Sequence, residues 1–120
     1  MTDQLLTANE VVIALSKLGA ELDATVTALK QAELDAANKR HEADQAESRA
    51  FVAADGSMDL RKHLARLAAG KQEQEAVIAE AVCRYLKTRI RAIEVRVDIG
   101  RSYGAAVRAE VSALGYSEQP

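Results

Sequence analysis

Few residues in the sequence have the chemistry of a catalytic or metal site. His41 and His63 are the two histidines, and Cys83 is the one cysteine. A metal site needs three or four ligands around one centre, and the hairpin predicted below does not bring these residues together. Paired carboxylates such as Glu73 and Glu75 have no apolar pocket beside them that would separate an acid from a base. We therefore expect no enzymatic activity, no metal and no cofactor.

The one suggestive group is basic and lies in the last third of the chain. Its members fall broadly on one side of an expected helix: Arg84, Lys87, Arg91, Arg101 and Arg108. Such a row is able to follow a phosphate backbone, because bound cationic side chains release condensed counterions. Glu94 and Asp98 interrupt the row, and Tyr103 alone gives no stacking platform. A flank of salt bridges between helices is the alternative, and both interpretations stay open.

Helices must position these residues, because small or apolar residues recur at alternating spacings of four and three through the second half of the chain. Only Gln72 is polar in this series. The series is Ala65, Ala69, Gln72, Ala76, Ala79, Cys83, Leu86, Ile90, Ile93, Val97, Gly100, Gly104, Val107, Val111 and Leu114. The pattern is typical of a helix packed along its length against another helix. We call this series, with its counterpart in the first half, the seam.

The first half of the chain carries the counterpart. Thr7 and Glu10 have the spacing of a capping box, which predicts a helix start near residue 8. The seam then runs through Val11, Leu15, Leu18, Leu22, Thr25, Leu29, Ala32, Ala36, Lys39, Ala43, Ala46, Ala50 and Ala53. Thr25 and Lys39 are its polar members.

Gly56 and Ser57 separate the two series, as the left-handed end of one helix and the N-cap of the next. The sequence therefore predicts an all-α fold, a long antiparallel two-helix hairpin of coiled-coil type. Its single domain over residues 1–120 has helix one at about 8–54, a turn at 55–57, helix two at about 58–114 and a tail at 115–120. Facing residues then have numbers that sum to about 112, which sets Gln72 opposite Lys39 or Arg40.

Three glycines interrupt helix two and weaken it locally. Gly70 and the stretch from Gly100 to Gly104 are the places where a bend is most expected. The seam nonetheless keeps its phase through both, which favours one continuous helix. The pair Gly100 and Gly104 predicts close packing opposite the start of helix one.

Apolar residues also lie outside the seam, and an isolated hairpin leaves them exposed. Large exposed apolar patches usually mark interfaces. The residues expected to form an oligomer or partner interface are Leu64, Val82, Tyr85, Val95 and Ile99. We expect a homodimer that forms an antiparallel four-helix bundle, with a higher oligomer or a different protein partner as alternatives.

Composition and charge narrow the setting. The formal net charge is −2, so the whole chain gives no electrostatic argument for a nucleic-acid or membrane partner. A single cysteine excludes an intramolecular disulfide and fits a reducing compartment. The start of the chain lacks the basic region of a signal peptide, and no apolar stretch approaches the about 20 residues that cross a bilayer. We expect a cytoplasmic protein with no membrane partner.

Two stretches, Arg49 to Lys62 and Arg89 to Glu110, carry a resemblance. With an alanine-rich arm ending in Gly56 and Ser57, a basic residue at Arg61, and Arg108-Ala-Glu110 after Asp98 to Ser102, the chain resembles small helical proteins of actinobacterial tailed phages. The resemblance implies a small phage accessory protein, of a group sometimes encoded near recombination or replication functions. Its implied location is the host cytoplasm and its implied role is non-enzymatic.

These observations favour a non-enzymatic, oligomeric helical protein that acts as an interaction or scaffolding module through protein–protein contacts. One alternative is a nucleic-acid-binding accessory factor in phage recombination or replication that uses the basic row. Another is a component of virion assembly, which differs from the first mainly in its partner.

Overall fold

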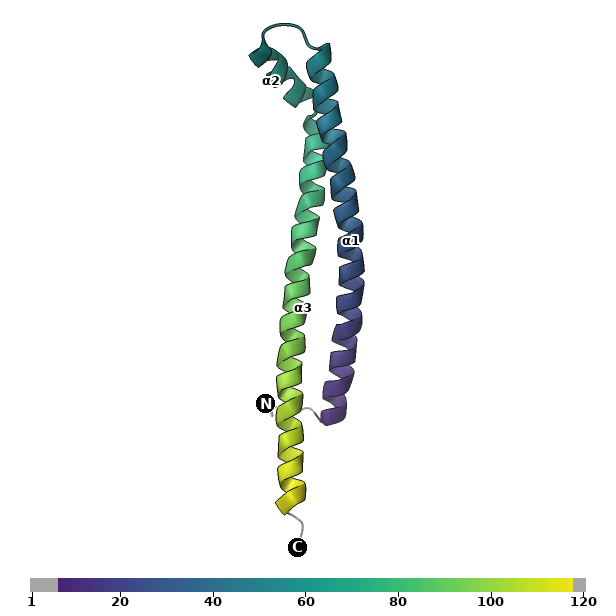
Figure 1. Ribbon diagram of the computed structural model, residues 1–120, viewed down its shortest axis with the longest axis vertical. Coiled ribbons are helices and arrows are strands. Elements are labelled where there is room, and N and C mark those ends of the chain that lie inside the picture. The colour runs from purple at the N-terminus through teal and green to yellow at the C-terminus, as the bar shows by residue number, and fades with distance from the viewer. Residues whose placement is uncertain (1–6, 118–120) are drawn as a thin grey trace, which may run out of the picture. The chain divides into compact units, whose positions relative to one another are not determined.

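The structure, a computed structural model, describes residues 7–117, with side chains through residue 115. Three helices and no strand are present in this part of the chain: α1 (Ala8–Ala53), α2 (Met58–Ala68) and α3 (Gly70–Ser117) (Figure 1). The prediction of an all-α fold is therefore confirmed. The expected lead-in over residues 1–6 and the last three residues of the expected tail lie outside the described residues. Helix α3 continues through Gly115 to Ser117 rather than ending near residue 114.

The start of α1 has the predicted capping box. The backbone N–H of Glu10 donates to Thr7 Oγ1 at 3.2 Å, and the N–H of Thr7 donates to Glu10 Oε2 at the same distance. The two bonds satisfy N–H groups that have no partner inside the helix. They fix the first turn of α1 next to Val11, the first buried seam residue.

The connection from α1 to α2 follows the predicted turn chemistry. Gly56 has φ +115°, a left-handed conformation that favours glycine. A Cβ atom at this position would also lie 2.8 Å from Leu60 Cδ2. Ser57 caps α2, because its hydroxyl oxygen accepts the N–H of Leu60 at 3.2 Å. The positive φ is the reason that the turn favours glycine, and a larger residue would also displace the Leu60 side chain.

Helix two, for which the seam favoured continuity and Gly70 was one of the most expected places for a bend, is divided at Ala69. This residue has φ −91° and ψ 5°, and its N–H donates to the carbonyls of Ala65 and Leu67. Helix α3 starts at the next residue, and its first hydrogen bond joins the Glu73 N–H to the Ala69 carbonyl at 2.9 Å. Figure 1 shows α2 inclined to α3 at this point. Gly70, which has little intrinsic preference for helix, is the first residue after the bend.

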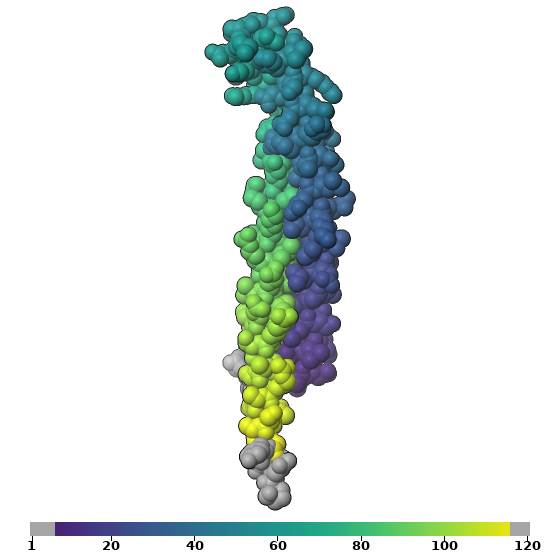
Figure 2. All heavy atoms as spheres, in the orientation of Figure 1, coloured from purple at the N-terminus to yellow at the C-terminus, as the bar shows by residue number. Residues whose placement is uncertain are grey.

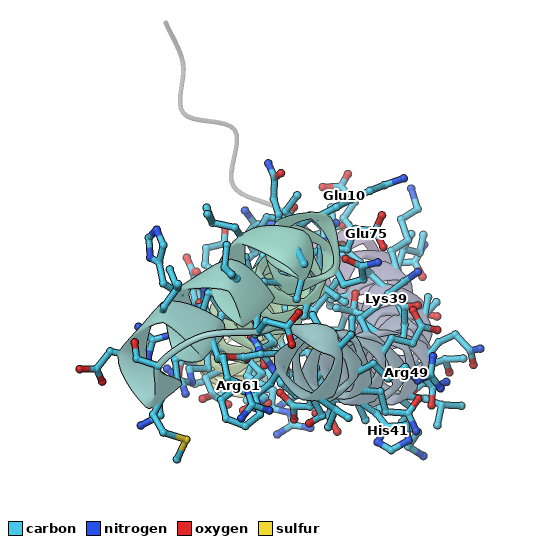
Figure 3. The ribbon with its side chains drawn as sticks, turned by 90° about the horizontal axis from the view of Figure 1, so that it is seen from above. Glu10, Lys39, His41, Arg49, Arg61 and Glu75 are labelled. Atoms are coloured by element: carbon cyan, nitrogen blue, oxygen red, sulfur yellow. The ribbon has the colours of Figure 1, made fainter. Side chains whose placement is uncertain are left out.

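A tertiary contact accompanies the bend. Arg61 on α2 donates from Nε and Nη2 to the carbonyl oxygen of Phe51, at 3.3 and 3.0 Å, and its guanidinium lies 4.3 Å from the centre of the Phe51 ring. That carbonyl is in the last turn of α1 and also accepts the backbone N–H of Ala54 at 3.3 Å. Figure 3 shows Arg61 between the two helices, and in Figure 2 the side chains of α2 meet those at the end of α1. A short α2 therefore serves to cap α1.

The helices divide into two compact units. The first unit pairs residues up to Val26 with residues from Thr88 onward, and the second comprises Thr27–Lys87. In the first unit the core is branched: Val11 and Ile93 are buried, with Ile93 only 1% exposed. A Cβ atom at Gly100 would lie 2.8 Å from Leu15 Cδ2, and one at Gly104 would lie 3.2 Å from Val11 Cγ1. The close packing predicted at these two glycines is confirmed.

In the second unit the core is made mostly of alanine. Its buried residues are Ala36, Ala43, Ala65, Ala69, Ala76, Ala79 and Cys83. All of them belong to the predicted seam. Two seam residues at the far end of α3, Val111 and Leu114, are instead exposed. In the first unit α1 does not extend alongside these two residues. Val11, near the start of α1 at Ala8, already packs opposite Gly104.

Candidate interaction surface

The residues with catalytic or metal-binding chemistry do not form a cluster. His41 and His63 are exposed, whereas Cys83 is buried on the seam. Figure 3 shows His41 pointing outward from α1. Within residues 7–117, no group of three or more His, Cys, Asp or Glu residues is placed to hold a metal ion. The carboxylates of Glu73 and Glu75 pair with Arg40 and Lys39.

Each long helix has two edges, one on either side of its seam residues, and we name each edge by where its residues stand in the sequence relative to the seam. The preceding edge consists of the residues immediately before a seam residue, and the following edge of those immediately after. In an antiparallel pair the two preceding edges lie on one side of the seam. Glu21 and Arg89, both on preceding edges, form an ion pair of 2.6 Å in the first unit. Arg40 and Glu73, both on following edges, form one of 2.7 Å in the second.

On the following edges of the second unit, Arg40 is held by two acids. It pairs with Glu73 and forms a two-point contact with Glu80, from Nη2 at 2.8 Å and Nε at 3.3 Å. These hydrogen bonds raise the pKa of Arg40, and the bonds to Glu80 make the largest contribution. The hydrogen bond from Arg40 is also the main reason that the pKa of Glu80 lies below its ordinary value. This cluster joins α1 to α3 and leaves this edge charged.

The polar seam position Gln72 does not pair with Lys39 or Arg40 as its placement suggested. Its Oε1 atom is enclosed and accepts no hydrogen bond from the described residues. Lys39 instead lies 3.8 Å from Glu75, a contact visible in Figure 3, and 4.0 Å from Glu42. The long cationic side chains pass Gln72 and reach acids on the edges of the helix pair.

The preceding edges of the second unit border a groove that is apolar on its α3 side and mixed on its α1 side, where Gln31, Asp35 and Asn38 are among the lining residues. Helix α3 contributes Ile78, Val82 and Tyr85, which are 56%, 44% and 61% exposed. Val82 lines a groove of about 640 Å³ whose other wall is α1, with Ala28, Leu34 and Asp35 among its residues. A second hollow beside it, of about 270 Å³, is lined by Ile78, Val82 and again Asp35.

The first unit has an apolar groove of its own on its preceding edges. It measures about 370 Å³ and is lined by Val11, Ala14, Leu15, Leu18, Arg96, Ile99, Gly100 and Tyr103. Ile99 at its rim is 64% exposed. Arg96 is the one ionisable residue besides Tyr103 in this lining.

The five predicted interface residues are all exposed, but they do not form one patch. Val82 and Tyr85 share the preceding edge of α3 in the second unit, and Ile99 lines the groove of the first. Val95 lies two residues after Ile93 and two before Val97, so it faces away from the seam. Leu64 lies on α2. The signal that separates Val95 is available in the sequence, because Leu64, Val82, Tyr85 and Ile99 each stand directly before a seam residue and Val95 does not.

The five basic residues of the predicted row are exposed and occupy the following edge of α3. Arg84 and Lys87 belong to the second unit, where Arg84 also lowers the pKa of Glu80. Arg91, Arg101 and Arg108 belong to the first. No ion pair involves these three arginines within the described part of the chain. Arg89, by contrast, is neutralised by Glu21.

Comparison with family models, with curated proteins and with solved structures finds no match to the chain. None of the three described helices has the length and hydropathy that a membrane span requires. The resemblance to phage accessory proteins therefore stays a prediction.

Proposed function

We propose that this protein is a non-enzymatic interaction module that self-associates, with the apolar preceding edge of α3 as its contact surface. The observation that carries the proposal is the contrast between the two edges. In the second unit the following edge is engaged in the Arg40, Glu73 and Glu80 cluster, while Ile78, Val82 and Tyr85 stand exposed on the other. Exposed apolar rows beside a groove are a common feature of association surfaces.

A homodimer that forms a four-helix bundle accounts for this surface. Two hairpins that meet through their preceding edges bury both apolar rows around one core, as antiparallel bundles do. The following edges then stay in water, including the Arg40, Glu73 and Glu80 cluster of the second unit.

The test is a comparison of two valines on α3 of the second unit. Val82 lines the groove and is 44% exposed, whereas Val77 stands on the following edge and is 47% exposed. Val82→Asp places a charge in the proposed contact and should shift the protein toward monomer. Val77→Asp makes the same chemical change outside it and should leave the mass unchanged. Mass is measured by light scattering over a concentration series.

A wild-type protein that stays monomeric at high micromolar concentration contradicts the proposal. So does an equal loss of association in both variants. Circular dichroism at 222 nm is recorded in parallel, because only variants of unchanged helicity report on association.

A second candidate function is nucleic-acid binding by the following edge of α3. The observation in its favour is that Arg91, Arg101 and Arg108 are exposed and form no ion pair among the described residues. Filter binding of a short DNA duplex across a salt series tests it. Arg101→Ala should weaken binding and lower the salt slope by about 1 if the residue contacts a phosphate. Lys17→Ala on α1 is the control, and a wild-type protein that retains no DNA at low salt refutes the candidate.

A further inference from the structure

The groove of the first unit combines an apolar lining with one permanent cation. Ala14, Leu18 and Ile99 form its walls, and the glycine at position 100 lets Leu15 sit close to α3. Arg96 lies in this lining and forms no ion pair within residues 7–117. A fitting occupant therefore presents apolar side chains together with an acidic group, because an arginine at an apolar contact favours a charge partner.

The second unit of this same chain presents those features. On its preceding edges, Ile78 and Val82 are exposed beside Asp35, which lines both hollows of that unit. Asp35 forms no ion pair among the described residues. The neighbouring acid Glu75 is already matched by Lys39.

From this complementarity we propose the partner and its orientation: the groove of the first unit receives the second unit of another copy of the chain, with Arg96 against the Asp35 of that copy. This inference rests on the proposed self-association, and it adds the relative orientation of the two copies. Two first units placed face to face would bring Arg96 against Arg96, and two second units would bring Asp35 against Asp35. Like charges opposed across an interface select against both arrangements.

The experiment exchanges the two charges between separate chains. Arg96→Glu and Asp35→Arg are each purified and examined by sedimentation equilibrium, alone and mixed in equal amounts. Alone, each variant should dimerise at least about tenfold more weakly than wild type, since like charges then meet at the contact. Mixed, they should recover association to within about threefold of wild type, because opposite charges again face each other in the mixed dimer.

Two matched variants control for charge change in general. Arg101→Glu and Glu33→Arg make the same substitutions on the following edges of α3 and α1. Each should dimerise like wild type, and their mixture should show no gain. Helicity at 222 nm is compared for all variants before association is measured.

The outcomes separate this inference from the proposal beneath it. A monomeric wild type overturns self-association itself, and with it the proposed orientation of the two copies. A wild type that dimerises, but whose Arg96→Glu and Asp35→Arg variants behave like the controls, overturns only the assigned orientation. A mixture that associates no better than the weaker variant does the same, because intermolecular complementarity is then absent.

Discussion

The enclosed amide oxygen of Gln72 predicts a substitution that stabilises the protein. A buried polar atom without a hydrogen bond costs about 1–3 kcal/mol, and Oε1 of Gln72 is such an atom. The residue as a whole is only half-buried, so the lower end of that range applies. Methionine has similar length, flexibility and helix propensity and no strongly polar atom. Gln72→Met should therefore raise the free energy of unfolding by about 1 kcal/mol.

The control stands two residues further along α3. Gln74 is exposed, so Gln74→Met makes the same change where no desolvation cost exists to be recovered, and it should leave stability unchanged. Both variants and wild type are unfolded in urea and followed at 222 nm, at two protein concentrations since self-association would add its own stability. The expected gain corresponds to a rise in Tm of about 4 °C.

A loss of stability in Gln72→Met would refute the reasoning, because it would mean that the amide makes favourable interactions in the native state. An equal effect in both variants would also refute it. The gain would then come from replacing glutamine by methionine on a helix and not from burial.

Three further predictions follow from burial, charge and helix propensity. Ile93→Ala should cost about 3 kcal/mol of unfolding free energy, because Ile93 is 1% exposed, whereas Val95→Ala, on the outward face, should change it by less than about 0.5 kcal/mol. The lowered pKa of Glu80 means that its contribution to stability is complete above its unfolded pKa and is lost as pH falls through the folded value. Glu80→Gln should thus flatten the acid side of a stability–pH curve measured by urea titration. Gly19→Ala, where a Cβ atom meets nothing within 4 Å, should stabilise by about 1 kcal/mol in thermal melts, and Gly100→Ala should gain less because Leu15 must move.

The seam shows how far spacing alone can predict this fold. Alternation of four and three identifies residues on one helical face, and the glycine at position 56 fixes where the chain reverses. Together they set the register, so that contacts such as Glu21 with Arg89 and Arg40 with Glu73 have numbers that sum close to the expected value. The alanine core of the second unit and the branched core of the first follow from the same series. Packing of this kind is a periodic property and is therefore visible in the sequence.

The bend at Ala69 is not periodic, which explains why spacing could not reveal it. Ala65, Ala69 and Gln72 keep the seam in phase, so the pattern favours a continuous helix. The bend falls beside Gly70 and is accompanied by a tertiary contact, in which Arg61 reaches the carbonyl of Phe51 at the end of α1. Arginine occurs on most exposed helix faces, and nothing in its spacing distinguishes the one that caps another helix.

The candidate interaction surface could be predicted from the sequence only in part. All five residues selected by their place outside the seam are exposed, but Val82, Tyr85 and Ile99 on α3 were grouped with Leu64, which lies on α2, and with Val95, which lies on the outward face of α3. What distinguishes Val95 from the other four is that it does not stand directly before a seam residue. In an antiparallel pair, residues directly before seam residues gather on one side together with those of the facing helix. Since the arginine row stands directly after seam residues, the same rule assigns the apolar and basic residues to opposite edges. Self-association through one edge would then leave the other exposed, so dimer formation and nucleic-acid binding by this protein are not mutually exclusive.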